Sequence, residues 1–385
     1  MSEWKECKLG DVVELFDGPH ATPKKAITGP VFLGISSLNK GKLEASQFEY
    51  ISEEDFVRWT KRVAPKQGDI VFSYETRLGE AAIIPEAFRC CLGRRLGLMR
   101  ANEKKVVSYF LLYYYLGPLF QRVIHERTIH GTTVDRLPLI DMPKFPVFLP
   151  PLPEQCAIAA VLSSLDDKID LLNRQNKTLE AMAATLFRQW FIEEADEGWE
   201  IGKLPDEFDF TMGQSPEGFS FNENGIGIPM FQGNADFGFR FPSERVYTTA
   251  PIRFAEPMDV LISVRAPVGA QNMALKRCCI GRGVAAFRYK KEKTYYTYTF
   301  FKLRSLITEI KQFNNEGTIF GSIGKTDFEG IDIIIPPNSL IAYFENSVGP
   351  INNKVIKNCY QIRTLQNLRD TLLPKLMSGE VRVAL

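Results

Sequence analysis

The chain contains two copies of one long unit. RCCLGRRLGLMR returns later as RCCIGRGVAAFR with six identities in twelve positions. Three segments recur at nearly the same interval, with shifts of 188, 190 and 186 residues: 89–100 as 277–288, 68–79 as 258–269, and 145–151 as 331–337. Short repeats of 20–50 residues indicate solenoids, whereas a unit of about 190 residues is a whole domain with its connector. The sequence therefore predicts two similar domains.

Composition agrees with a two-domain globular protein. The 385 residues are 45% hydrophobic and 24% charged, and they have a net charge of +1. No apolar run approaches the roughly 18 residues that a membrane span requires. The opening residues MSEWKECKLGD lack the apolar core of a signal peptide, so we expect a cytoplasmic protein with no membrane partner.

Cysteine spacing argues against metal and disulfide frameworks. Seven cysteines include the adjacent pairs Cys90–Cys91 and Cys278–Cys279, and no CxxC spacing occurs. Because the pairs occupy equivalent repeat positions beside apolar residues, we expect buried thiols.

Each copy begins with a part that predicts a mixed α+β globule, at 1–150 and 196–337. One helix is expected in each, at about 106–125 and 294–313. Short β-branched and apolar runs predict strands at 70–73, 81–84, 96–100, 145–149, 260–264, 284–289 and 331–335.

The second part of each copy, at 151–195 and 338–385, carries a heptad pattern. We call the residues at alternating steps of four and three the seam. In the first copy they are Ile158, Leu162, Leu165, Ile169, Leu172, Asn176, Leu179, Ala183, Leu186 and Trp190. In the second they are Phe344, Val348, Ile351, Val355, Asn358, Ile362, Leu365, Arg369, Leu372 and Leu376. A stripe of this length is typical of a coiled coil.

Two similar units related by a two-fold axis place equivalent helices antiparallel. The predicted fold is α+β, with two similar globular domains separated by a pair of long antiparallel coiled-coil helices and pseudo-two-fold symmetry. Asn176 and Asn358 on the seam either fix the helix register or face solvent, and Arg369 suggests incomplete burial at its level. Such symmetry suits duplex DNA.

Proline and serine mark the helix boundaries. Pro153 suits a first helical turn, and Ser339 can cap the second helix. Pro350 should bend or break that helix, and Pro374 should bend or end it.

With these features in place, the chain resembles the DNA-specificity subunit of type I restriction-modification enzymes over nearly its whole length. The resemblance rests on LPPLPEQCAIAAVLSSLDDKIDLLNRQNKTLEAMAATLFRQWF at 149–191 and LRDTLLPKLMSGEV at 368–381. The Gly68-Asp69 pair before an apolar strand is a weaker point of similarity.

The resemblance implies a division of labour. Each globular part would be a target-recognition domain that reads one half of a split site on double-stranded DNA. The helices would set the spacing and dock two methyltransferase subunits, which associate with restriction/translocase subunits. S-adenosylmethionine, ATP and Mg would belong to those partners, and this chain would hold no cofactor.

Motifs for catalysis are missing from the sequence. Ile335-Pro336-Pro337-Asn338 has the wrong order for an adenine methyltransferase loop, and Gly225-Ile226-Gly227 lacks a third glycine. No GxxxxGK[ST] occurs, and three histidines offer little for a metal or triad site. Glu86, Asp166 and Asp167 are interpreted as solvated surface charge. We expect no catalytic, cofactor-binding or metal-binding residue.

Base readout needs polar side chains on loops, together with basic groups for phosphates. The expected base-reading or backbone-reading positions of the first copy are Ser36, Ser37, Ser73, Tyr74, Thr76, Arg77, Thr132 and Thr133. Those of the second copy are Gln232, Asn234, Ser263, Arg265 and Thr318. Expected phosphate contacts are Lys24, Lys25, Lys40 and Lys42. At the local shift of 190, Arg265 aligns with Glu75 instead of Arg77, as expected for domains that read different bases.

Two other functions remain open from the sequence. One is a bifunctional DNA methyltransferase with an unrecognised catalytic domain, which binding of S-adenosylmethionine would support. The other is a coiled-coil assembly protein whose globules bind only protein, which the absence of a DNA footprint would favour.

Overall fold

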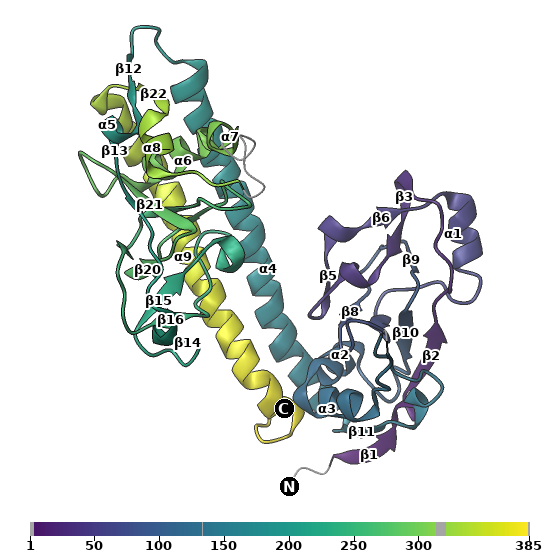
Figure 1. The fold of residues 1–385 in the computed structure, drawn as a ribbon. Helices are drawn as coiled ribbons and strands as arrows, with labels where there is room; N and C mark the ends of the chain where they lie inside the picture. The colour runs from purple at the N-terminus through teal and green to yellow at the C-terminus, as the bar shows by residue number, and fades with distance from the viewer. Residues whose placement is uncertain (1–3, 133, 313–320, 384–385) are drawn as a thin grey trace. The chain divides into compact units, whose positions relative to one another are not determined.

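The computed structural model describes residues 4–132, 134–312 and 321–383. They form two compact units, one made of Met1–Asp170 with Thr364–Leu385 and the other of Leu171–Arg363 (Figure 1). The boundary falls within the two long helices, α4 (Leu152–Arg188) and α9 (Asn338–Met377). Each unit therefore contains one globular part and a portion of both helices.

The first unit is built on an antiparallel four-stranded sheet of order β2-β10-β7-β8. These strands are β2 (Val13–Asp17), β10 (Leu96–Ala101), β7 (Ile70–Ser73) and β8 (Ala81–Ile83). A second sheet, β6-β3-β9, consists of β6 (Glu49–Tyr50), β3 (Ala26–Leu33) and β9 (Cys90–Leu92), with β3 and β9 parallel. A separate pair joins β1 (Lys5–Lys8) to β11 (Pro146–Leu149).

The second unit repeats the four-stranded sheet, a parallel strand pair and the separate two-stranded pair, and its second sheet is larger. Its four-stranded sheet has the order β13-β21-β18-β19, with strands β13 (Phe208–Met212), β21 (Val284–Tyr289), β18 (Val260–Ser263) and β19 (Gln271–Met273). A five-stranded sheet contains the parallel pair β15 (Ile228–Phe231) and β20 (Cys278–Ile280). It is completed by β14 (Phe221–Asn222), β16 (Tyr247–Thr248) and β17 (Phe254–Ala255), and β12 (Glu200–Lys203) pairs with β22 (Asp332–Ile335). The four-stranded sheets, the parallel pairs β3–β9 and β15–β20, and the pairs β1–β11 and β12–β22 recur in the two units, which confirms the duplication predicted from sequence.

The predicted strands are found within one or two residues of their expected ends, and both copies of the cysteine pair lie in buried strands. The four thiols are free, and burial raises the pKa of Cys90, Cys91 and Cys278 to about 12. The thiols are therefore protonated at neutral pH and pack as apolar groups.

The expected single helix at 106–125 is wrong in detail. It divides into α2 (Ser108–Leu116) and α3 (Pro118–Arg127). Gly117 between them has extended backbone (φ −72°, ψ 154°), because a residue before proline avoids the helical region. The equivalent region also divides, into α6 (Tyr296–Ser305) and α7 (Ile307–Gln312). The smaller helices α1 (Glu53–Trp59), α5 (Leu204–Glu207) and α8 (Lys325–Gly330) lie elsewhere in the globular parts.

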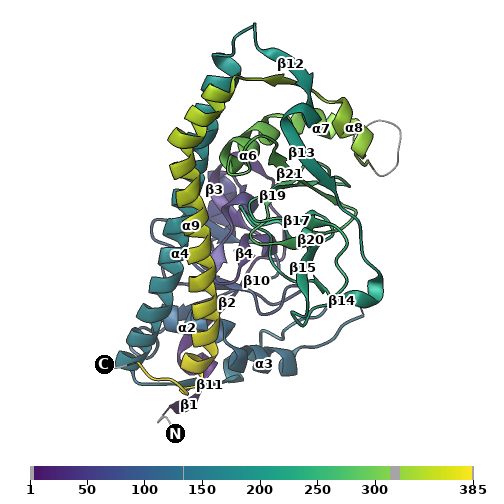
Figure 2. The same ribbon diagram turned by 90° about the vertical axis from the view of Figure 1, so that its left-hand side faces the viewer.

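The long helices run antiparallel within each unit, as predicted (Figure 2). In the first unit Glu154 of α4 pairs with Arg382, which follows α9, and Asp166 pairs with Arg369. In the second unit Asn176 bonds to Asn358, and the ring centroids of Phe187 and Phe344 lie 5.7 Å apart. In each unit, residue numbers along α9 decrease as those of their partners along α4 increase, which is the pattern of antiparallel helices.

The seam is largely buried. Ile169, Leu172, Asn176, Val355, Asn358 and Ile362 are at most 8% exposed, while Leu165, Leu179, Ile351 and Leu365 are half-buried. The solvent-facing alternative for the asparagines is wrong, because both are 1% exposed and the Asn358 side-chain amide donates to Asn176 Oδ1 at 2.9 Å. A polar pair on a buried seam is the arrangement that specifies register.

Ser339 and Pro350 depart from the sequence-based expectations for the helix boundaries, whereas Pro153 and Pro374 agree with them. Pro153 lies in the first turn as predicted, but Ser339 lies inside α9, and the Pro337 carbonyl accepts the first amide bonds. α9 continues without a break through Pro350, whose side chain is exposed. Pro374 falls in the last turn before Met377, where α9 ends.

The interpretation of Asp166 as solvated charge is also wrong. Asp166 is 9% exposed and accepts from Tyr113 at 2.8 Å and Arg369 at 2.9 Å. Arg369 is accommodated on the seam because the opposite helix supplies its counter-charge. Within the described residues, no helix is both long and apolar enough to cross a bilayer.

Candidate nucleic-acid interface

Four loops that are distant in sequence meet in the first unit. They are loop A (34–37), loop B (74–80), loop C (93–95) and loop D (128–132 and 134–137). Backbone bonds connect them: Gly93 donates to Leu33 at 2.8 Å, Tyr74 to Arg95 at 3.2 Å, and Leu137 to Tyr74 at 2.8 Å. The two loops singled out from the sequence, around residues 77 and 132, therefore belong to one cluster.

The second unit forms the same cluster from 232–236, 264–270, 281–283 and 321–323, its loops A to D. Gly281 donates to Phe231 at 2.9 Å, Val264 to Gly283 at 2.9 Å, and Ile323 to Val264 at 3.0 Å. Each of these bonds has its counterpart in the first unit. The sequence divergence of the loops has therefore not altered the backbone framework.

Side chains at equivalent points of the two clusters differ in charge. A β-bridge joins Glu75 to Arg136 in the first unit, and the equivalent bridge joins Arg265 to Ser322 in the second. The structure thus supports the alignment of Arg265 with Glu75. Glu75 also pairs with Arg95 at 2.8 Å. The same position is therefore acidic in one unit and basic in the other.

Several expected contact residues of the first unit are exposed on or near the cluster: Ser36, Thr76, Arg77, Thr132, Lys24, Lys25 and Lys40. Arg77 bonds to Glu80 at 3.1 Å and to the Ile35 carbonyl at 3.4 Å, which connects loops B and A. Lys25 pairs with Glu49 at 2.6 Å. Thr133 lies outside the described residues.

Other expected residues of the first unit are buried or, in the case of Lys42, paired with the long helix α4. Ser37 and Ser73 are fully buried, and their hydroxyls donate to the Gln47 and Glu75 carbonyls. Tyr74 is 5% exposed and donates to Asp17 at 3.0 Å, and burial followed by this hydrogen bond raises its pKa. Lys42 pairs with Asp170 of α4 at 2.6 Å. Ser37, Ser73 and Tyr74 are buried and have internal partners, so we withdraw them as DNA contacts, whereas the Lys42 side chain is 38% exposed and stays a candidate.

In the second unit Gln232 and Arg265 are exposed and Asn234 is half-buried. Ser263 is fully buried, where it donates to the Pro267 carbonyl and accepts from the Ala270 amide, both at 2.8 Å. It closes the turn of loop B, so we withdraw it too. Thr318 lies outside the described residues.

Sequence reasoning missed loop C and the basic residues of loop D. Arg94, Arg136 and Arg282 are exposed, and none has a carboxylate within 4 Å among the described residues. A signal was available for two of them, because Arg94 and Arg282 lie inside the repeat that revealed the duplication.

Buried ion pairs fix the strands that carry the loops. Asp69, just before β7, is 1% exposed and pairs with Arg100 at 2.7 Å. Asp259 pairs with Arg288 at the equivalent place, and burial nevertheless raises the pKa of Asp259. The Gly68-Asp69 pattern therefore has a structural role.

The long helices also hold the globular parts. Gln155 of α4 accepts from the Val107 amide at the start of α2 at 2.9 Å, and Glu345 of α9 accepts from the Tyr298 amide of α6 at 2.8 Å. Each long helix thus caps a shorter helix of its own unit, where the amides would otherwise lack acceptors.

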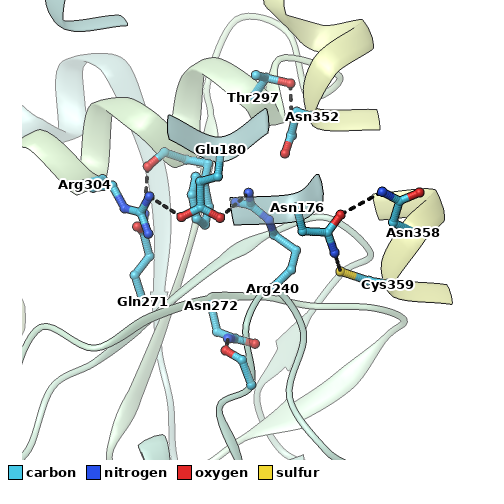
Figure 3. Close-up of polar contacts among 12 residues, drawn as sticks. Asn176, Glu180, Arg240, Gln271, Asn272, Thr297, Arg304, Asn352, Asn358 and Cys359 are labelled. Carbon is cyan, nitrogen blue, oxygen red and sulfur yellow. Dashed lines mark hydrogen bonds and ion pairs between the residues drawn. The ribbon is translucent and has the colours of Figure 1, made fainter. Parts of the chain in front are cut away.

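A second anchor lies in the second unit (Figure 3). The Glu180 carboxylate of α4 forms an ion pair with Arg240 at 3.0 Å and a second one with Arg304 of α6. The Arg240 guanidinium lies 3.8 Å from the Phe300 ring centroid. This network connects α4 to α6 and to the segment around Arg240, whose carbonyl accepts from the Met273 amide of β19 at 2.9 Å.

Comparisons with known proteins agree with this arrangement. The profile of the type I restriction modification DNA specificity domain matches residues 1–181 and 196–340. The MjaX type I restriction enzyme specificity subunit of Methanocaldococcus jannaschii is 30% identical over 99% of this chain and 94% of its own length. The MjaIX specificity subunit of the same organism is 26% identical with the same coverage of both chains.

Among solved structures, the type I restriction-modification S subunit from M. genitalium has a similar fold. Its TM-score is 0.64 at 17% identity, covering 97% of this chain and 96% of that one. The duplicated α+β units, their paired helices and the two matches along the sequence agree. This chain belongs to the family of type I restriction-modification DNA specificity subunits.

Proposed function

We propose that each unit reads one half of a split site on double-stranded DNA through its own loop cluster. The observation that carries this proposal is the repetition of one backbone framework with different side chains, Glu75 with Arg136 in one unit and Arg265 with Ser322 in the other. Base readout depends on side-chain donors and acceptors at the groove. Two loop clusters with the same backbone and different side chains are suited to recognising two different half-sites.

The long helices would set the gap between half-sites and dock two methyltransferase subunits, with restriction/translocase subunits joining the assembly. A stiff helix has a rise of 1.5 Å per residue, so its length defines a fixed distance. The helical pairing and the Asn176–Asn358 bond support a fixed register within the second unit.

The chain itself would be non-catalytic. Methyl transfer and ATP hydrolysis would take place on the partners, which would bind S-adenosylmethionine, ATP and Mg. The absence of a methyltransferase loop motif and of a P-loop motif from the sequence supports this division.

A domain exchange tests the reading role. Residues 1–150 are replaced by the corresponding domain of another specificity subunit, the chimera is expressed with its methyltransferase partner, and methylated motifs are mapped by methylome sequencing. We expect one half of the motif to change and the other half and the gap to remain. Changes in both halves would contradict independent readers.

A matched insertion tests the spacing role. One heptad in each long helix adds about 10 Å, which corresponds to about three base pairs at 3.4 Å each. The tolerated gap should lengthen by that amount, and an unchanged gap would contradict the spacing role. Binding of S-adenosylmethionine by the purified chain would instead favour a bifunctional methyltransferase.

A further inference from the structure

The repeated segment at 89–100 and 277–288 keeps three arginines in both copies. The structure gives two of the three positions carboxylate partners. These pairs are Arg100 with Asp69, Arg288 with Asp259, Arg89 with Glu53, and Arg277 with Glu256. The third position, Arg94 and Arg282, has no carboxylate within 4 Å among the described residues. Folding therefore accounts for two arginine positions and leaves the third unexplained.

Arg94 and Arg282 occupy the same place in the two units. Each lies in loop C, the turn between β9 and β10 or between β20 and β21, directly after a buried glycine. Arg94 and Arg282 are both exposed. The turn is held from both sides, because Gly93 donates to Leu33 and Arg95 accepts from Tyr74. An exposed cation is thus presented from a fixed backbone at the middle of each loop cluster.

The neighbouring positions differ between the units, but this one does not. Glu75 becomes Arg265 and Arg136 becomes Ser322, whereas Arg94 remains arginine at 282. Two readers of different sequences face different bases but the same sugar-phosphate backbone. Phosphate contacts position a protein without selecting sequence, and base contacts select it. An arginine kept at the same position of both loop clusters is therefore suited to the sugar-phosphate backbone, which both half-sites share.

We propose that Arg94 and Arg282 are equivalent, sequence-independent phosphate contacts, one in each unit. This inference rests on the proposed DNA-reading function and assigns a role within it. Guanidinium binds phosphate oxygens through paired N–H donors, and its charge displaces counterions from DNA. Each arginine contributes affinity and a share of the salt dependence at every sequence.

The test uses the chain assembled with its methyltransferase subunits and a labelled duplex carrying the motif found by methylome sequencing. Binding is measured by fluorescence anisotropy between 50 and 200 mM salt for Arg94→Ala, Arg282→Ala and the double variant. Each phosphate contact contributes about 0.9 to the slope of log affinity against log salt. We expect each single variant to lower the slope by about 0.9, so that its affinity falls about 3.5-fold less than that of the wild type between 50 and 200 mM salt. The double variant should lower the slope by twice as much.

Arg89→Ala and Arg277→Ala are the matched controls. They remove the same charge at the other end of β9 and β20, where the side chain already has a glutamate partner. The slope should not change in either control. Arg94→Lys and Arg282→Lys keep the charge and should retain most of the slope. Thermal unfolding establishes that every variant is folded.

The same variants are measured on duplexes with single base-pair changes in each half-site. The proposal requires Arg94→Ala to weaken all duplexes by one common factor. Loss concentrated at one base pair would make Arg94 a base reader, and an unchanged slope would remove it from the interface. Both results overturn the inference. Failure of the wild-type assembly to discriminate any split site would instead overturn the proposed function.

Discussion

Glu180 compensates a buried positive charge, and its removal should destabilise the second unit strongly. The Arg240 side chain is 0% exposed, and its Nη2 lies 3.0 Å from Glu180 Oε2. Its Nε and Nη1 have no hydrogen-bond partner among the described residues. Burial lowers the pKa of Arg240 to about 10, with Glu180 acting in the opposite direction.

Glu180→Ala leaves the guanidinium with the Phe300 ring as its neighbour, 3.8 Å away at the centroid. Removing one partner of a buried ion pair typically costs about 3–5 kcal/mol. The expected loss is of that size, because alanine is an excellent helix former and adds no helix penalty. Arg304 also bonds to Glu180 but is 42% exposed, so losing that contact adds little.

Hydrogen exchange measured by mass spectrometry resolves this loss within the chain. The slowest amides of α6 and of residues 171–188 should exchange roughly 100-fold to several thousand-fold faster, since each 1.4 kcal/mol corresponds to a factor of ten. Peptides from 4–132 provide an internal reference. Arg304→Ala is the control and should cost less than about 1 kcal/mol. Equal effects of Glu180→Ala and Arg304→Ala would refute the reasoning, as would a loss below 1 kcal/mol for Glu180→Ala.

Three other substitutions test the seam, a buried carboxylate and one reading residue. Asn176→Leu leaves the Asn358 amide without its 2.9 Å partner and should lower the free energy of unfolding in urea by about 1–3 kcal/mol. The double variant Asn176→Leu with Asn358→Leu should recover that loss. Additive losses from the two substitutions would contradict coupling between the asparagines. Burial raises the pKa of Glu345, so its contribution to stability is complete below about 4.5 and decreases as pH rises through the raised pKa. Glu345→Gln should remove that decrease for the amides of α6 in hydrogen exchange between pH 4 and 8, and an unchanged pH profile would exclude Glu345 as its source. Arg77→Ala should cost about 1–3 kcal/mol at one base pair in competition binding if Arg77 reads guanine, and a uniform loss at all sequences would assign it to phosphate.

The positions on the seam and the strand segments were predictable because both are local periodic patterns. Alternating steps of four and three identify a helix stripe without knowledge of its partner. The internal repeat added a second, independent reading of each segment, which made strands such as 70–73 and 260–263 recognisable. The family was indicated by a resemblance of the helical sequences at 149–191 and 368–381.

The candidate site was predictable only in part. Arg77, Arg265 and Thr132 were expected to be available and are exposed. Ser73 and Ser263 were chosen for their hydroxyls, but each lies at the buried end of a strand and closes its own turn. Local sequence does not distinguish a serine facing a core from one facing a ligand.

The sequence by itself determined the duplication, the mixed α+β class, the pair of heptad helices and the family. Only the tertiary structure decided which loops meet, because loops B and D become neighbours through pairings between residues that are about 60 positions apart. It also decided that Asp166 and Arg240 are buried, since burial depends on which other elements cover a side chain. Asp166, which the sequence analysis interpreted as solvated, forms an internal ion pair for that reason, and Arg94 and Arg282 stand out because neither has a carboxylate within 4 Å among the described residues.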